Sequence, residues 1–184
     1  MQGVFMTYST KVKLSKALES LLQCNDITKI TISQIVGNCN VSRQTFYNNF
    51  EDIYELLYWS HAMLIEGAVN TFWKEEDFIQ AFTTATSIMR DHKVFYEQLV
   101  QLDGINSFQN TFALKNIELS KIRIKKVSNK EADRDLLFAL NLYWHGTSKM
   151  IVNWITTGMK ESPHDLAILL HTSLPSILLP YWKK

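Results

Sequence analysis

Residues 42–49 carry many hydrogen-bonding side chains and no carboxylate. If this stretch is an α-helix, Phe46 and Phe50 share one face and the polar side chains point away from it. Arginine donates two hydrogen bonds to guanine, glutamine or asparagine does so to adenine, and a threonine methyl group contacts thymine. Hydroxyl and amide groups also bind phosphate oxygens. The pattern predicts a DNA-reading surface, although a merely polar helix face is the alternative; its residues are Ser42, Arg43, Gln44, Thr45, Tyr47, Asn48 and Asn49.

Two short helices must hold this surface in place. Thr31 and Gln34 have the spacing of a capping box, which predicts a helix that begins at Ile32. That helix should end near 38–40, where Asn40 can adopt the left-handed conformation. Ser42 then caps a second helix almost at once. Two short helices separated by about three residues form a helix-turn-helix.

A first helix is expected over about 9–23, and lysines cluster at its start. Lys11, Lys13 and Lys16 oppose the usual preference for negative charge at a helix N-terminus. They are interpreted either as phosphate contacts or as an ordinary solvated helix start. Lys11 and the capping Thr31 complete the predicted DNA-contacting set.

The whole chain favours an all-α fold. Its 184 residues are 46% hydrophobic and include only six Gly and three Pro, so long stretches lack helix breakers. About nine helices are expected, with a three-helix bundle containing the helix-turn-helix in 1–52 and a larger helical domain in 53–184. The later helices are predicted over about 52–72, 75–91, 94–102, 106–128, 132–157 and 163–179. The net charge of +1 neither favours nor excludes nucleic acid.

Several classes of protein fit the sequence poorly. No uncharged apolar run is long enough to cross a membrane, and the N-terminus lacks a secretion signal, so a cytoplasmic protein without membrane contact is expected. Cys24 and Cys39 are interpreted as reduced structural thiols. Met1 and Met6 are alternative starts.

Catalytic motifs are absent from the sequence, and no enzyme, cofactor or metal site is expected. The five histidines are dispersed without metal-ligand spacing. A metal-responsive sensor that brings them together in space is kept as an alternative; they are His61, His92, His145, His164 and His171.

The N-terminal third resembles the tetracycline-repressor (TetR) family. The resemblance covers roughly residues 10–60 and is carried by Thr31, Ile32, Ile35-Val36, Cys39, Asn40-Val41-Ser42, Thr45-Phe46-Tyr47, Phe50 and Leu56-Leu57. It implies that the second short helix enters the major groove of an operator, with Thr45 and Tyr47 in contact with DNA. Whether binding lowers or raises transcription does not follow from it.

Three positions depart from the family pattern. Asn40 replaces the usual turn glycine, and Asn49 replaces a common histidine. Ile53 stands where a phosphate-contacting lysine is usual, directly after Glu51 and Asp52. Weaker non-specific DNA affinity and a shallower salt dependence are therefore expected. A regulator-like adaptor that binds proteins and has lost DNA binding is the alternative.

A second resemblance, to the dihydroxyacetone-kinase-regulator branch, is scattered over the downstream chain. It rests on Phe95-Tyr96, on 104–108, on Gly146 and on 154–163. It does not identify an effector.

The last predicted helix is apolar on most faces and needs cover on most faces. The TetR resemblance implies a four-helix bundle between two subunits, although a monomer core is the alternative. The homodimer would present two recognition helices to a palindromic operator on double-stranded DNA. The expected interface residues are Leu140, Ile151, Trp154, Leu169, Leu170 and Leu174.

Aromatic side chains of the central helices are candidates for an effector pocket, although each is also a candidate for plain core. They are Trp59, Trp73, Tyr96, Phe108, Phe112 and Trp144. The expected effector is an unidentified small molecule or protein that changes DNA affinity.

Overall fold

The computed structural model describes residues 2–75, 77–102 and 107–182 and is all-α, as expected. These residues form ten α-helices and one short 3₁₀ helix, Ile27–Lys29, and no strand. The α-helices are α1 (Gln2–Leu22), α2 (Ile32–Asn38), α3 (Arg43–Tyr47), α4 (Ile53–Glu75), α5 (Phe78–Asp91), α6 (Lys93–Leu99), α7 (Phe108–Ser128), α8 (Arg134–Thr156), α9 (Pro163–Thr172) and α10 (Leu179–Trp182). None of the described helices is long and apolar enough to span a bilayer.

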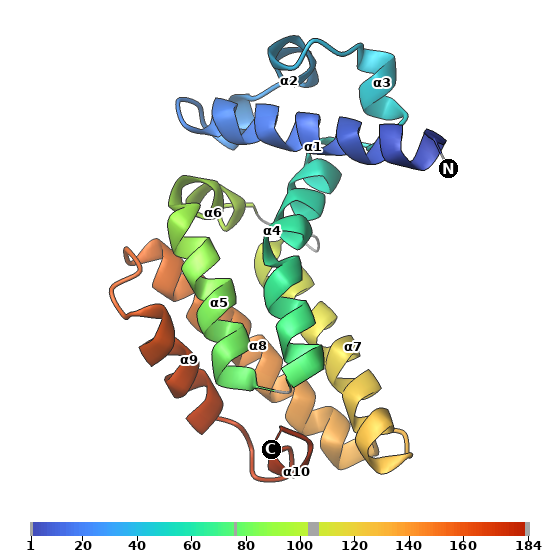
Figure 1. Ribbon diagram of the computed structural model, residues 1–184. Helices are drawn as coiled ribbons and strands as arrows, with labels where there is room; N and C mark the ends of the chain where they lie inside the picture. The colour runs from blue at the N-terminus through green and yellow to red at the C-terminus, as the bar shows by residue number, and fades with distance from the viewer. Residues whose placement is uncertain (1, 76, 103–106, 183–184) are drawn as a thin grey trace. The chain divides into compact units, whose positions relative to one another are not determined.

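The chain forms two compact units, Met1–Glu66 and Gly67–Lys184, which divide inside α4. The domain boundary predicted from the sequence lies earlier, between residues 52 and 53. In the N-terminal unit α2 packs against α1, and α3 packs against α2 (Figure 1). Apolar side chains from all the helices of this unit meet in one core: Leu14, Leu18, Ile35, Phe46, Phe50, Leu56 and Leu57.

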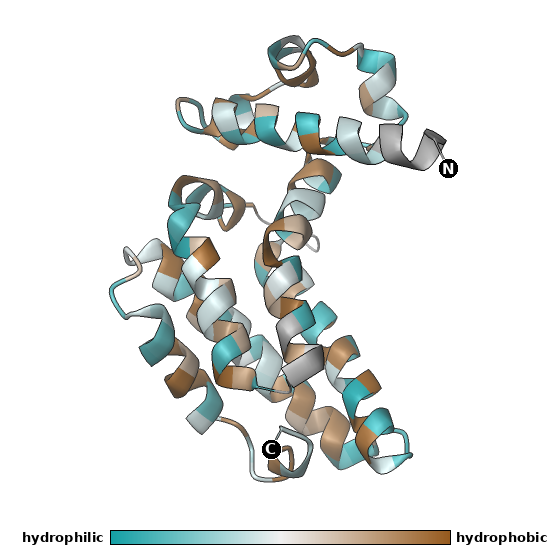
Figure 2. Ribbon diagram, viewed as in Figure 1, coloured by the Kyte–Doolittle hydropathy of each residue, from teal (hydrophilic) through white to brown (hydrophobic). Residues whose placement is uncertain are grey.

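The C-terminal unit is built from pairs of neighbouring helices. The α7 and α8 helices run side by side, and α5 packs against α9 (Figure 1). Its core includes Met89, Leu99, Ala113, Leu140, Ile151 and Ile155, all at most 1% exposed. The middle of α9 is hydrophobic and its ends are hydrophilic (Figure 2). Burial of these apolar side chains supplies most of the favourable free energy of such a helical unit.

The predicted length of the last helix was wrong. It begins as expected, with Ser162 accepting a hydrogen bond from the Asp165 N–H at 3.1 Å and Pro163 in the first helical position. It ends at Thr172 rather than near 179, because Pro175 has no N–H to continue the helical hydrogen bonds. The separate helix α10 follows. The first helix also begins earlier than predicted, at Gln2.

Candidate nucleic-acid interface

The predicted capping box starts α2. The Thr31 hydroxyl oxygen accepts a hydrogen bond from the Gln34 N–H at 3.3 Å, and Gln34 Oε1 accepts one from the Thr31 N–H at 2.8 Å. Each side chain therefore satisfies a backbone donor that the first turn of the helix leaves open. Thr31 is exposed, but these hydrogen bonds explain its presence without DNA.

The turn between α2 and α3 is tight. Asn40 has φ 54°, in the left-handed region that asparagine tolerates better than most residues with a side chain. The Val41 N–H then donates to the Val36 carbonyl at 3.1 Å, which closes the end of α2. Asn40 therefore fills the role of the glycine that the TetR pattern has at this turn.

Ser42 caps α3, as the sequence predicted. Its hydroxyl oxygen accepts a hydrogen bond from the Thr45 N–H at 2.9 Å, and the two hydroxyl groups lie 2.8 Å apart. Thr45 is half-buried, so part of its side chain remains accessible. The cap fixes the first turn of a helix that is only five residues long.

The two faces of α3 separate as expected. Phe46 is 0% exposed and Phe50 is 2% exposed, and their ring centres lie 6.0 Å apart in the core. On the opposite face the side chains of Arg43, Gln44, Tyr47 and Asn48 are exposed. Tyr47 is 49% exposed although it is a large aromatic residue. The buried phenylalanines thus hold an acid-free polar face toward solvent.

Two hydrogen bonds order this polar face. Arg43 donates from Nη1 to Ser33 Oγ of α2 at 2.8 Å. Gln44 donates from Nε2 to Asn48 Oδ1 at 2.9 Å, one turn further along α3. Ser33 was absent from the predicted set, because a contact between residues ten apart on two helices leaves no local sequence signal.

Asn49 differs from the other predicted contacts. It is half-buried, its Nδ2 donates to the Thr45 carbonyl at 2.7 Å, and its buried Oδ1 has no hydrogen-bond partner among the described residues. The amide therefore turns toward its own helix. This geometry does not favour the phosphate contact that the sequence led us to expect.

Lys11 is also held by its own unit. Its Nζ lies 4.8 Å from the centre of the Phe50 ring and 6.0 Å from that of Trp59. An ammonium over an aromatic face is attracted by the negative charge of the ring surface. The geometry favours a structural role over a phosphate contact.

Five of the six predicted interface residues lie in the core of their own chain. Leu140, Ile151, Trp154, Leu170 and Leu174 are 0–7% exposed, so they are unavailable to a second subunit. Their spacing marked the inward stripe of each helix, and periodicity alone does not distinguish an inward stripe from an interface. Only Leu169, 55% exposed, lies on the surface. Other exposed apolar residues of α8 and α9 are Phe138, Leu142, Met150 and Ile168.

Four of the predicted effector residues form one chain of ring contacts. Tyr96 lies 6.2 Å from Phe108, Phe108 lies 5.7 Å from Phe112, and Phe112 lies 6.5 Å from Trp144. All four are buried, and Trp144 donates from Nε1 to Ser120 Oγ at 2.8 Å. These four rings therefore form one packed, buried cluster.

The other two predicted effector residues do not join this cluster in the described structure. Trp59 belongs to the N-terminal unit, where its ring lies 5.9 Å from that of Phe50. The side chain of Trp73 lies outside the described part of the chain.

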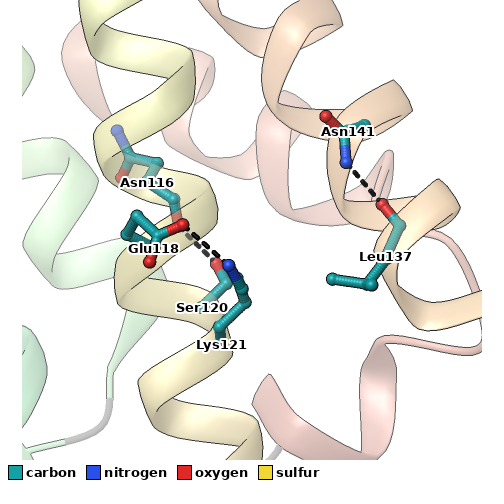
Figure 3. A network of polar contacts seen from close by, with 6 residues as sticks. All are labelled: Asn116, Glu118, Ser120, Lys121, Leu137 and Asn141. Carbon is teal, nitrogen blue, oxygen red and sulfur yellow. Dashed lines mark hydrogen bonds and ion pairs between the residues drawn. The ribbon is translucent and has the colours of Figure 1, made fainter. Parts of the chain in front are cut away.

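Charged side chains of α7 differ in their burial: Lys121 and Lys125 lie at the surface, whereas Arg123 is only 1% exposed. Lys121 pairs with Glu118 at 2.8 Å within α7 (Figure 3). On the neighbouring helix α8, the Asn141 side chain donates a hydrogen bond to the Leu137 carbonyl, also within its own helix (Figure 3). Lys125 pairs with Glu131. Each of these lysines therefore has a carboxylate partner. In the described residues, no three His, Cys, Asp or Glu side chains gather as a metal site would require.

Comparisons with known proteins agree with this geometry. The model TetR_C_8, described as "Transcriptional regulator C-terminal region", matches residues 76–176. The HTH-type dhaKLM operon transcriptional activator DhaS of Lactococcus lactis subsp. lactis (strain IL1403) is 27% identical over 111 residues. That match covers 58% of this chain and 56% of the relative, so it spans little more than half of the relative's length.

A solved structure supports the fold over nearly the full length. The dihydroxyacetone kinase operon activator DhaS superposes with a TM-score of 0.65 at 21% identity, covering 94% of this chain and 96% of that one. The proteins that match are regulators rather than enzymes. Since the family model covers more than half of the chain and the helix-turn-helix lies before it, the chain belongs to the TetR family of transcriptional regulators.

Proposed function

We propose that this regulator binds a palindromic DNA operator as a homodimer, through the outward face of α3, and that an effector in the C-terminal unit changes its DNA affinity. The observation that carries the proposal is the exposed, acid-free set Arg43, Gln44, Tyr47 and Asn48 on a doubly capped helix-turn-helix. Such a helix places its side chains against base edges in the major groove.

The dimer part of the proposal rests on exposed apolar side chains. Phe138 and Leu142 of α8 are 72% and 66% exposed, and Leu169 of α9 is 55% exposed. Leaving large apolar side chains in water costs free energy that a second copy of the same face would recover. Gly146 of α8 has no atom of the described residues within 4 Å of the position that a Cβ would take, so packing against them does not require a glycine there. A glycine allows the backbone of a second helix to approach closely.

The effector part rests on the aromatic cluster around Trp144. Because the rings are packed, an effector would enter the cluster only by moving some of them, and its binding would then favour a second state of the C-terminal unit. An effector that prefers one state would change the DNA affinity of the dimer. Both matches carry the name of an operon activator, DhaS, and activation is the direction of control that we carry over.

Selection of bound sequences from random DNA, followed by gel shifts over a range of salt concentrations, tests the DNA-binding proposal. We expect enrichment of an inverted repeat whose half-sites lie about one helical turn, ~34 Å, apart. Tyr47→Ala should weaken binding to all sequences, whereas Gln44→Ala should change which bases are preferred. Gln23→Ala changes an exposed glutamine in the turn directly after α1; it is the matched control and should change neither.

Failure of the selection would separate the alternatives. If the wild-type protein enriches no sequence at low salt, the operator proposal is wrong and the adaptor interpretation takes its place. If binding occurs but both Tyr47→Ala and Gln44→Ala behave like the parent, the reading face has been assigned to the wrong residues.

A further inference from the structure

Arg43 is joined to a residue outside its own helix. Its Nη1 donates to Ser33 Oγ at 2.8 Å, across the turn that separates α2 from α3. Both residues are exposed, so neither is held by burial. The Ser33 hydroxyl therefore links the guanidinium of α3 to the first turn of α2.

This hydrogen bond selects which part of the guanidinium remains available. A guanidinium has five N–H donors in a planar fork and cannot lose its proton in a protein. With Nη1 turned to Ser33, the edge formed by Nε and Nη2 is left for another partner. No carboxylate pairs with Arg43 in the part of the chain that the structure describes.

The free edge matches one base better than the others. Two parallel N–H donors fit the O6 and N7 acceptors of guanine in the major groove, and no other base shows two acceptors side by side there. A free arginine side chain loses considerable rotamer freedom when it makes such a pair. A guanidinium that is already tethered loses less, so the same contact yields more affinity.

We infer that Ser33 is a positioning residue for base recognition, which holds Arg43 so that its Nε–Nη2 edge reads a guanine in each half-site. The inference rests on the proposed operator binding and names one base and one supporting residue for it. Ser33 itself does not touch the base; it acts through Arg43.

The test uses the full-length protein and the operator that the wild-type protein selects. Each base pair of one half-site is replaced in turn, and the dissociation constant is measured for the parent, Arg43→Ala, Ser33→Ala, Ser33→Thr and the double variant. Arg43→Ala should weaken binding by about 10- to 100-fold, with the loss of preference confined to one G·C pair. Ser33→Ala should weaken binding by about three- to tenfold and relax preference at the same base pair.

Two further measurements distinguish positioning from a general structural effect. Ser33→Ala in the Arg43→Ala background should have no additional effect, because the residue that it positions is gone. Ser33→Thr keeps the hydroxyl and should restore the base preference. Ser20→Ala, an exposed serine on α1, is the matched control and should leave affinity and preference unchanged.

The outcomes separate this inference from the proposed function. If the wild-type protein selects no operator, the proposed function fails. If Arg43→Ala relaxes one G·C pair while Ser33→Ala leaves that pair unaffected, only the role of Ser33 is refuted. If Arg43→Ala instead weakens all sequences equally and lowers the salt slope by about one, Arg43 binds a phosphate and the guanine assignment is wrong.

Discussion

The ammonium of Lys11 lies 4.8 Å from the centre of the Phe50 ring, so a residue of α1 contacts the residue that closes the helix-turn-helix. Phe50 is 2% exposed and also contacts the rings of Phe46 and Trp59. The Lys11 ammonium therefore makes cation–π contacts with the aromatic core of the N-terminal unit.

Replacing Lys11 by Met tests this structural role. The stem is kept and the charge is lost, so we expect the N-terminal unit to lose about 0.5–1 kcal/mol of stability. The salt slope of DNA binding should stay unchanged. Lys16→Met, at an exposed position of the same helix, should leave stability within about 0.5 kcal/mol. A salt slope lowered by about one in Lys11→Met would show that Lys11 binds a phosphate after all.

Phe138→Arg tests the proposed dimer. Two copies of a charge at the centre of a symmetric apolar face would be desolvated together, so we expect the protein to become monomeric and to lose operator affinity. Ile122→Arg is the matched control, because Ile122 is 56% exposed but lies on α7. Sedimentation equilibrium measures the oligomeric state. A dimer that survives Phe138→Arg unchanged would place the interface on another surface.

Tyr143→Phe tests the link between α8 and α9. The Tyr143 hydroxyl donates to the Leu170 carbonyl at 2.8 Å in the core of the C-terminal unit. Removing the hydroxyl leaves a buried carbonyl with one hydrogen bond fewer, and we expect a loss of about 1 kcal/mol in the free energy of unfolding. Urea titration measures it. A change of less than about 0.3 kcal/mol would contradict the importance of this hydrogen bond.

Tyr143 also predicts a dependence of stability on alkaline pH. Burial raises the pKa of the Tyr143 phenol above its ordinary value of 10.0. The folded state then prefers the protonated form, so its contribution is fully present below pH 10 and is lost as the pH rises beyond that. Between pH 9 and 11 we therefore expect Tyr143→Phe to lose less stability than the parent. Equal losses in both proteins would show that other groups dominate the alkaline transition.

Ile53→Lys restores, at the start of α4, the lysine that is usual at this position of the TetR pattern. Of the two acids before it, only Asp52 caps the helix: its Oδ1 accepts a hydrogen bond from the Glu55 N–H at 2.8 Å. Glu51 takes part through its backbone N–H, which donates to Glu55 Oε2 at 2.6 Å. Adding a cation here should raise non-specific DNA affinity and increase the salt slope by about one. Ile65→Lys, further along α4, is the comparison and should leave the slope unchanged. Equal slopes for parent and Ile53→Lys would place this position away from the DNA backbone.

Local rules predicted the helix-turn-helix almost residue by residue. The cap at Thr31, the left-handed Asn40 and the cap at Ser42 each depend on side chains within a few residues of the backbone groups that they satisfy. The 3.6-residue period then assigned Phe46 to the core and Arg43 to the surface. Caps and turns depend on residues that are close in sequence, so they can be predicted from the sequence alone.

Tertiary packing decided which apolar faces are buried within the chain and which side chains contact each other. Whether an apolar stripe such as that of Leu140 and Leu170 faces its own chain or a second one depends on which helices lie beside it, and the period is the same in both cases. Likewise, Lys11 lies over Phe50 and Arg43 donates to Ser33 only because separate helices meet. The chain's local pattern determined where α3 begins and which way its faces point, whereas the partners of its side chains follow from contacts between residues distant in sequence.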